Sequence, residues 1–124
     1  MTTMQRVLIV DDKEDNLYYL RTLLAAYGYD VESAAHGAEA LAKARHSPPN
    51  LVIADLLMPV MDGYEFLRSL RQLPDGDRPK VVFCTTENDV AHIARALHAG
   101  ANEYIMKPFD KDIVTAKFQE VGLI

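Results

Sequence analysis

Strand-like and helix-like segments alternate along the whole chain, and this alternation constrains the fold more than any other feature. The expected strands are residues 6–10, 30–34, 51–54, 81–84 and 103–106. The run from Arg6 to Val10 is rich in β-branched residues, as is typical of a buried strand, and the helical segments between the strands are the crossovers that parallel strands require. The sequence therefore predicts a doubly wound α/β fold, with one parallel sheet covered by helices on both faces.

The expected helices are identified by apolar residues at helical spacing. They span residues 14–27, 38–45 and 64–73, a segment with Val90, Ile93 and Leu97, and a last segment with Val114, Phe118 and Val121 after a capping Asp110. Gly28 and Gly100 stand where the first and fourth helices should end. With 124 residues, the chain is long enough to bury one core, so we expect a single domain over residues 1–124.

Composition excludes several classes of function. The net charge of -5 argues against a surface that binds nucleic acid or an anionic membrane. The single cysteine, Cys84, permits no intrachain disulfide, so we expect a buried thiol and a cytoplasmic location. No apolar segment approaches the roughly 20 residues that span a bilayer.

Three of the apolar runs end on charged residues. Asp11 and Asp12 follow the first run, Asp55 follows the third, and Lys107 follows the fifth. If the runs are parallel strands, these side chains meet at the carboxyl edge of the sheet. Three carboxylates in one place repel unless a hard cation such as Mg²⁺ lies among them. A carboxylate beside Mg²⁺ and a lysine can accept a phosphoryl group.

Taken together, these residues form a family signature. The chain resembles the receiver domains of two-component response regulators, the CheY-like superfamily, from Arg6 to about Val121. The matching blocks are Ile9-Val10-Asp11-Asp12, Asp55, Met58-Pro59-Val60-Met61-Asp62-Gly63, Thr85 and Lys107-Pro108-Phe109. The resemblance implies a five-stranded sheet of order 2-1-3-4-5 with five helices. Residues 81–124 look like alphaproteobacterial chemotaxis-type single-domain regulators, and the first half looks more like receivers attached to hybrid kinases.

The resemblance also implies roles for individual residues. Asp55 would be the phosphoacceptor. Mg²⁺ would be bound by Asp12, Asp55 and the backbone carbonyl of Leu57, with Asp11 reaching the ion through water. Lys107 would bind one oxygen of the phosphoryl group. This division of roles suits phosphoryl transfer, which depends on positioning and charge neutralisation.

Two further residues would form the switch. By resemblance, the hydroxyl of Thr85 would bind the phosphoryl group, and the ring of Tyr104 would fill the space that Thr85 leaves. The surface of the fourth helix, fifth strand and fifth helix would then change its affinity for a protein target. The donor would be a histidine kinase or a histidine phosphotransferase, and the chain would be a signalling switch with no enzymatic role beyond its own phosphorylation and dephosphorylation.

Two interpretations of the chain as a receiver remain open. It is either a single-domain regulator or a receiver excised from a hybrid kinase or multidomain regulator, and the lack of an output domain favours the first. Leu57 stands where some members carry a polar residue that places the hydrolytic water, and Thr86 where the family usually has alanine. Because the apolar side chain of Leu57 cannot orient that water, we expect slow loss of phosphate from Asp55.

Other classes of protein fit less well. A haloacid-dehalogenase-type phosphatase needs a second acid two positions after the nucleophile, and Leu57 cannot serve. A flavodoxin-like nucleotide binder needs an anion cradle after the first strand, where this chain is acidic. Four histidines could suggest a transition-metal site, but their spacing favours a surface location. They are His36, His46, His92 and His98.

Overall fold

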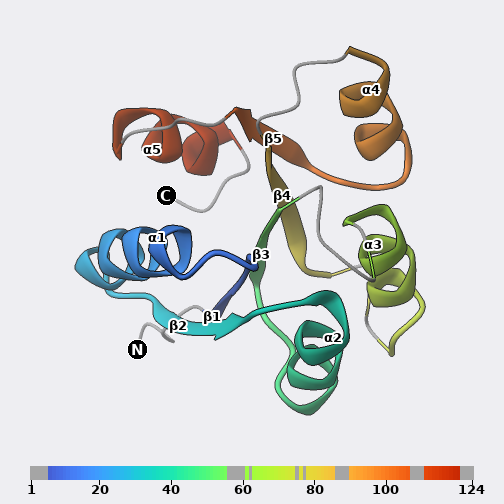
Figure 1. The fold of residues 1–124 in the computed structure, drawn as a ribbon, viewed down its shortest axis with the longest axis horizontal. Helices are drawn as coiled ribbons and strands as arrows, with labels where there is room; N and C mark the ends of the chain where they lie inside the picture. The colour runs from blue at the N-terminus through green and yellow to red at the C-terminus, as the bar shows by residue number, and fades with distance from the viewer. Residues whose placement is uncertain are drawn as a thin grey trace.

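A computed structural model describes residues 6–55, 61, 63–74, 76, 78–85, 90–106 and 111–120. Strands and helices alternate throughout, as Figure 1 shows. The strands are β1 (Arg6–Val10), β2 (Asp30–Ala34), β3 (Leu51–Asp55), β4 (Lys80–Thr85) and β5 (Glu103–Met106). The helices are α1 (Glu14–Ala26), α2 (Gly37–His46), α3 (Gly63–Arg71), α4 (Val90–His98) and α5 (Lys111–Glu120).

The strands form one parallel sheet of order β2-β1-β3-β4-β5, which confirms the predicted fold class and strand order. Strand order reverses between β1 and β3, because the chain moves outward to β2 and then returns to the other side of β1. In sheets of this kind, ligands bind at the carboxyl ends of the strands near this reversal. The first and third strands, which carry the acids, are direct neighbours there.

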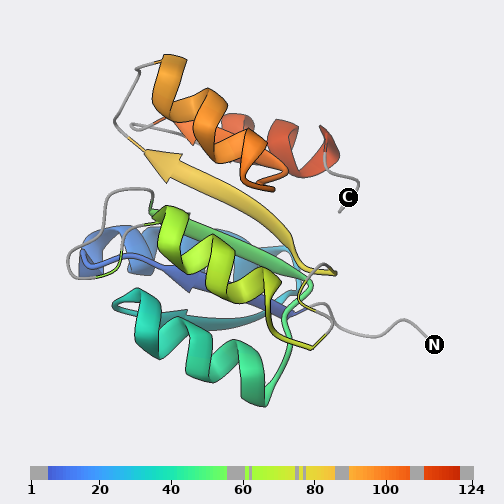
Figure 2. The same ribbon diagram turned by 90° about the vertical axis from the view of Figure 1, so that its right-hand side faces the viewer.

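Each face of the sheet is covered by helices, α1 and α5 on one side and α2, α3 and α4 on the other (Figures 1 and 2). Successive side chains of a strand point to opposite faces. In β1, Leu8 and Val10 therefore join the core under α2 and α3, whereas Val7 and Ile9 pack against Leu20 and Leu24 of α1. Both faces are apolar because both are buried, which explains the continuous apolar runs in the sequence.

The helix ends differ slightly from those expected. α1 ends at Ala26 and is followed by Gly28 with φ of 87°, a left-handed conformation that favours glycine. α3 ends at Arg71, two residues earlier than expected, because the N–H of Leu73 bonds to Leu70 in a tighter turn. The expected cap Asp110 lies outside the described residues.

Two asparagines connect the strands at the amino edge of the sheet. Oδ1 of Asn50 accepts the backbone N–H of Arg6 at 2.8 Å, and the backbone of Asn50 bonds to both Arg6 and Lys80. Oδ1 of Asn102 accepts the N–H of Val81, also at 2.8 Å. The hydrogen bonds to these two side chains extend the pairing between strands at the amino edge of the sheet. The site lies at the opposite, carboxyl edge.

Candidate functional site at the carboxyl edge of the sheet

Three carboxylates gather where β1 and β3 end. One side-chain oxygen from each of Asp11, Asp12 and Asp55 lies within 4.8 Å of the others. The pairing of Val10 with Ala54 explains this, because it places the next residues of both strands side by side. Asp11 and Asp55 are buried, with exposures of 2% and 8%, whereas Asp12 is exposed. The structure thus brings together the three acids that the sequence predicts for the site.

The carboxylate of Asp11 is held by two hydrogen bonds. The backbone N–H of Lys13 donates to Oδ1 at 2.9 Å, and the side-chain amide of Asn16 donates to Oδ2 at 3.1 Å. The N–H of Asp11 itself bonds to the carbonyl of Ala34 at 3.1 Å, which ties the residue to β2. Asn16 was not predicted as a site residue. Many polar residues occupy the first turn of a helix, so this position alone did not single out Asn16.

The donor set fits a hard divalent cation. Mg²⁺ prefers oxygen ligands at about 2.1 Å in an octahedron, so ligand oxygens on opposite sides of the ion are about 4.2 Å apart. The 4.8 Å limit on the three carboxylates is close to that span. Closing the cluster around one ion therefore needs only small side-chain movements. It would also remove the repulsion between the buried charges.

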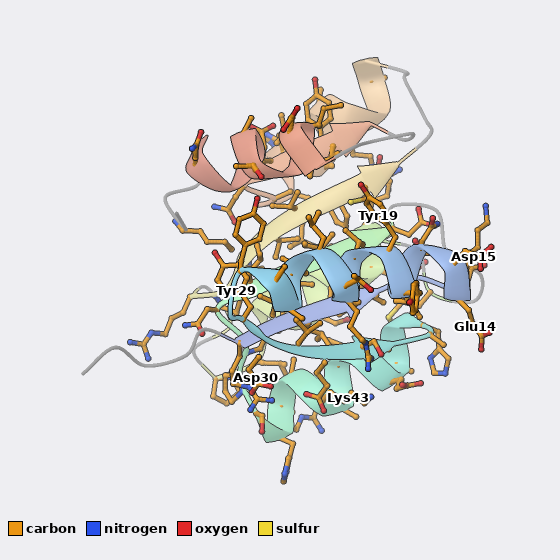
Figure 3. The ribbon with its side chains drawn as sticks, turned by 90° about the vertical axis from the view of Figure 1, so that its left-hand side faces the viewer. Glu14, Asp15, Tyr19, Tyr29, Asp30 and Lys43 are labelled. Carbon is orange, nitrogen blue, oxygen red and sulfur yellow. The ribbon has the colours of Figure 1, made fainter. Side chains whose placement is uncertain are left out.

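The negative charge extends onto the first turn of α1. Glu14 and Asp15 are exposed there and project from the same end of the molecule as the tips of the strands (Figure 3). Tyr29 and Asp30 lie at the opposite end. Acidic residues favour a helix N-terminus, but they disfavour a bound anion nearby. This distribution agrees with an edge that attracts cations.

Other residues predicted for the site are placed only in part. Thr85 is the last residue of β4, next to the strand that carries Asp55, but its side chain is not described. Tyr104 in β5 lies opposite Phe83, is partly buried and packs against the core under α2 and α3. Lys107, Leu57 and Thr86 lie outside the described residues.

The histidines whose side chains the structure describes do not form a metal site. In that part of the chain, the aspartate trio is the one group of three or more potential ligands with atoms this close. His36 instead caps α2, where its Nδ1 accepts the N–H of Glu39 at 3.2 Å, and His98 is exposed. A surface location is thus confirmed for both. Cys84 is buried, as expected.

The fold of the sheet and the acidic cluster at its carboxyl edge are together typical of a receiver domain. The model of the family described as response regulator receiver domain matches residues 7–119, so the chain belongs to that family. Receivers of this family bind Mg²⁺ at an acidic pocket and take phosphoryl groups from histidine kinases or phosphotransferases. They act mostly as signalling switches and not as enzymes.

The individual relatives comprise solved structures of similar length and longer curated proteins. Among solved structures, chemotaxis protein CheY4 of Vibrio cholerae superposes with a TM-score of 0.91 at 34% identity, covering 96% of this chain and 99% of that chain. The receiver of sensor histidine kinase PA1611 from Pseudomonas aeruginosa, with a magnesium ion in its active site cleft, has a TM-score of 0.85 at 28% identity. That match covers 94% of this chain and 96% of the other.

Curated relatives include a probable transcriptional regulator ycf27 of Porphyridium aerugineum, 38% identical over 117 residues, 94% of this chain and 48% of the relative. Transcriptional regulatory protein PrrA of Mycobacterium tuberculosis is 39% identical over 107 residues, 86% of this chain and 45% of that protein. The chain thus spans about half the length of these relatives. Within the described residues, no helix is both long and apolar enough to cross a membrane.

Proposed function

We propose that Asp55 accepts a phosphoryl group from a phosphohistidine of a kinase or phosphotransferase. One carboxylate oxygen of Asp55 attacks phosphorus, the bond between phosphorus and the histidine nitrogen breaks, and the nitrogen keeps the bonding pair. The product is an aspartyl phosphate on this chain and a free histidine on the donor. The observation that carries this proposal is the position of Asp55 as the last residue of β3, within 4.8 Å of two other carboxylates.

The neighbouring residues fit a supporting role. Asp12, Asp55 and the backbone carbonyl of Leu57 would hold Mg²⁺ directly, with Asp11 acting through a water molecule. When bound, the ion would neutralise charge on the incoming phosphoryl oxygens. The two hydrogen bonds to Asp11 keep its carboxylate oriented, so its contribution to the site is already positioned. The remaining phosphoryl oxygens would be bound by the hydroxyl of Thr85 and the ammonium of Lys107.

Output would pass through the α4–β5–α5 surface to a protein partner. Thr85 ends β4, and Tyr104 lies on the neighbouring strand β5, so a movement of one can be followed by the other. Exposed apolar side chains already lie on this surface. They are Leu97 on α4 and Ile113 on α5, with exposures of 40% and 41%. A protein partner would cover such residues more readily than a nucleic acid would.

How the signal leaves the receiver depends on whether the full protein is a single-domain regulator or a longer protein with further domains. A single-domain regulator would bind its target directly, as the near-complete coverage of CheY4 suggests. A receiver from a longer protein would act on an attached domain, as the longer transcriptional regulators suggest. We favour direct binding in the cytoplasm. The resemblance of residues 81–124 to alphaproteobacterial chemotaxis-type regulators stays a prediction that bears on the identity of the target.

The test is phosphorylation by a small donor. The protein is incubated with acetyl phosphate and Mg²⁺, and its intact mass is measured. Wild type should gain the mass of one phosphoryl group, Asp55→Asn should gain none, and omission of Mg²⁺ should abolish the gain. Asp112→Asn, which removes an exposed acid on α5, is the matched control and should behave as wild type. Modification of Asp55→Asn to the level of wild type would overturn the proposal.

Slow loss of the phosphate is the second part of this proposal. An apolar side chain at position 57 cannot orient the attacking water, so the aspartyl phosphate should persist longer in wild type than in Leu57→Asn. The decay of the phosphorylated mass after removal of the donor measures both lifetimes. Equal lifetimes, or a shorter one for wild type, would remove the role given to Leu57.

A further inference from the structure

Helix α4 makes specific contacts with its neighbour α3. Of its side chains that the structure describes, only Ala96 is buried, at 1% exposure. The neighbouring helix α3 buries Phe66, Leu67 and Leu70 at 1% or less. The methyl group of Ala96 removes less apolar area from water, and so stabilises less, than these three side chains do. Specific contacts to α3 add to what the Ala96 side chain contributes to holding α4.

One of these contacts fixes the end of α4 that leads into β5. Arg71, the last residue of α3, donates from Nη2 to the carbonyl of Gly100 at 2.9 Å and to Oδ1 of Asn102 at 3.4 Å. Its Nη1 donates to the carbonyls of Gly76 and Pro79 at 2.9 Å and 2.7 Å. Since one planar guanidinium joins the turn after α3 to the turn after α4, this end of α4 is anchored.

The second contact is of a different kind. The guanidinium carbon of Arg95, on α4, lies 4.2 Å from the ring centroid of Tyr64, the second residue of α3. This distance is well within the range of a cation–π interaction. Tyr64 is buried at 4% exposure in the core that Tyr104 packs against, while Arg95 is exposed. An exposed arginine can leave a ring without creating a buried unpaired charge, so this contact is reversible.

We propose that the Arg95–Tyr64 contact is a latch that holds α4 in its resting position, and that phosphorylation of Asp55 opens it. The anchored end at Arg71 would serve as the pivot. Tyr64 lies at the start of α3, nine positions after Asp55 in the sequence, and Arg95 lies on the helix that forms part of the output surface. The latch therefore joins the segment leading from the phosphoacceptor to the surface read by the partner. Its regulatory part rests on the proposed function.

The latch is tested first without any phosphate. Amide hydrogen exchange of α4 is measured in wild type, Arg95→Met, Arg95→Lys and Arg68→Met. Removal of the charge in Arg95→Met should raise local opening of α4 by roughly two- to thirty-fold, the range that cation–π energies imply. Arg95→Lys keeps a cation and should lie between Arg95→Met and wild type. Arg68→Met removes an exposed arginine of α3 and should match wild type. Equal exchange of α4 in wild type and Arg95→Met would overturn the latch.

Urea unfolding of the same variants separates local from global effects. Arg95→Met should lose no more global stability than the rise in α4 opening implies, because the unfolded chain lacks the Arg95–Tyr64 contact just as the opened helix does. A loss of global stability clearly larger than the rise in α4 opening would also overturn the latch, because the substitution would then disturb more than this contact.

The regulatory part is tested with the phosphorylated protein. Acetyl phosphate and Mg²⁺ should raise exchange of α4 in wild type but add little in Arg95→Met, whose latch is already open. By linkage, Arg95→Met should also bind beryllofluoride with Mg²⁺ more tightly than wild type, by the same factor as its increase in α4 opening. Phosphorylation that leaves exchange of α4 unchanged in wild type would overturn this part. If Asp55 is not the acceptor, neither protein gains phosphoryl mass, and the comparison without phosphate still decides the latch itself.

Discussion

Asn16 donates a hydrogen bond from its side-chain amide to Oδ2 of Asp11 at 3.1 Å, and so links α1 to the acidic edge. Loss of this bond in Asn16→Ala should leave the Asp11 carboxylate less well oriented. We expect Mg²⁺ to bind roughly tenfold more weakly, as is typical for residues that orient ligands. Calorimetric titration measures the change. Thr22→Ala, at an exposed position of the same helix, is the control, and equal affinities for the two variants would contradict the role of Asn16.

The acidic trio should make stability depend on divalent cations. Without Mg²⁺, Asp12→Asn should stabilise the protein by up to ~1 kcal/mol, because it removes one of three like charges. With Mg²⁺ at about 100 times its dissociation constant, wild type should gain about 2.7 kcal/mol, and Asp12→Asn should gain less. Urea unfolding with and without the ion gives both values. A gain in Asp12→Asn equal to that of wild type would show that Asp12 is not a ligand.

Asn102 should be important for the stability of the sheet. The N–H of Val81 is buried, and in Asn102→Ala it would lose its acceptor, at a cost of about 1–3 kcal/mol. Asn102→Asp keeps an oxygen at the same position and should cost much less. Thermal unfolding compares the two variants with wild type. Similar losses for Ala and Asp would indicate that the hydrogen bond contributes little.

Tyr29 should make stability fall at alkaline pH. Burial raises the pKa of its phenol, and the nearby Tyr27, whose ring centroid is 6.3 Å away, adds to the shift. Since the folded state favours the neutral phenol, its contribution to stability is complete below pH about 10 and is lost as the pH rises through the raised pKa. Urea unfolding at a series of alkaline pH values should therefore show a shallower decline for Tyr29→Phe than for wild type.

The control for this prediction is Tyr18→Phe, because Tyr18 is 74% exposed and its phenol meets nearly the same solvent in both states. Its stability should decline with pH as wild type does. If Tyr29→Phe declines just as steeply, the burial of Tyr29 has no measurable effect on folding.

The sequence predicted those parts of the fold that depend on local pattern. The bounds of β1, β2 and β5 agree with the expectation. β1, for example, is an apolar run that ends directly before Asp11. The three acids of the site were also predictable, since strand ends in a parallel sheet must meet at one edge. The start of α2 was not, because His36 is a less common N-cap than serine or aspartate.

Contacts between distant elements could not be predicted from sequence pattern. Arg71 and Arg95 look like ordinary solvated cations on amphipathic helices, and their partners depend on how α3 and α4 pack. Asn16 likewise resembles many polar residues in a first helical turn. Its role depends on the path of the chain between β1 and α1, which no periodicity encodes.

Arg71 binds mostly main-chain oxygens, at positions 76, 79 and 100. Every residue supplies a carbonyl oxygen, so the side chain at position 79 is largely irrelevant to this interaction. We therefore expect position 79 to tolerate many residue types, whereas position 71 requires the planar guanidinium of arginine. Diversification at position 79 can then proceed without loosening the junction between the two helices, whereas Gly76 and Gly100 are constrained by close backbone contacts and a positive φ.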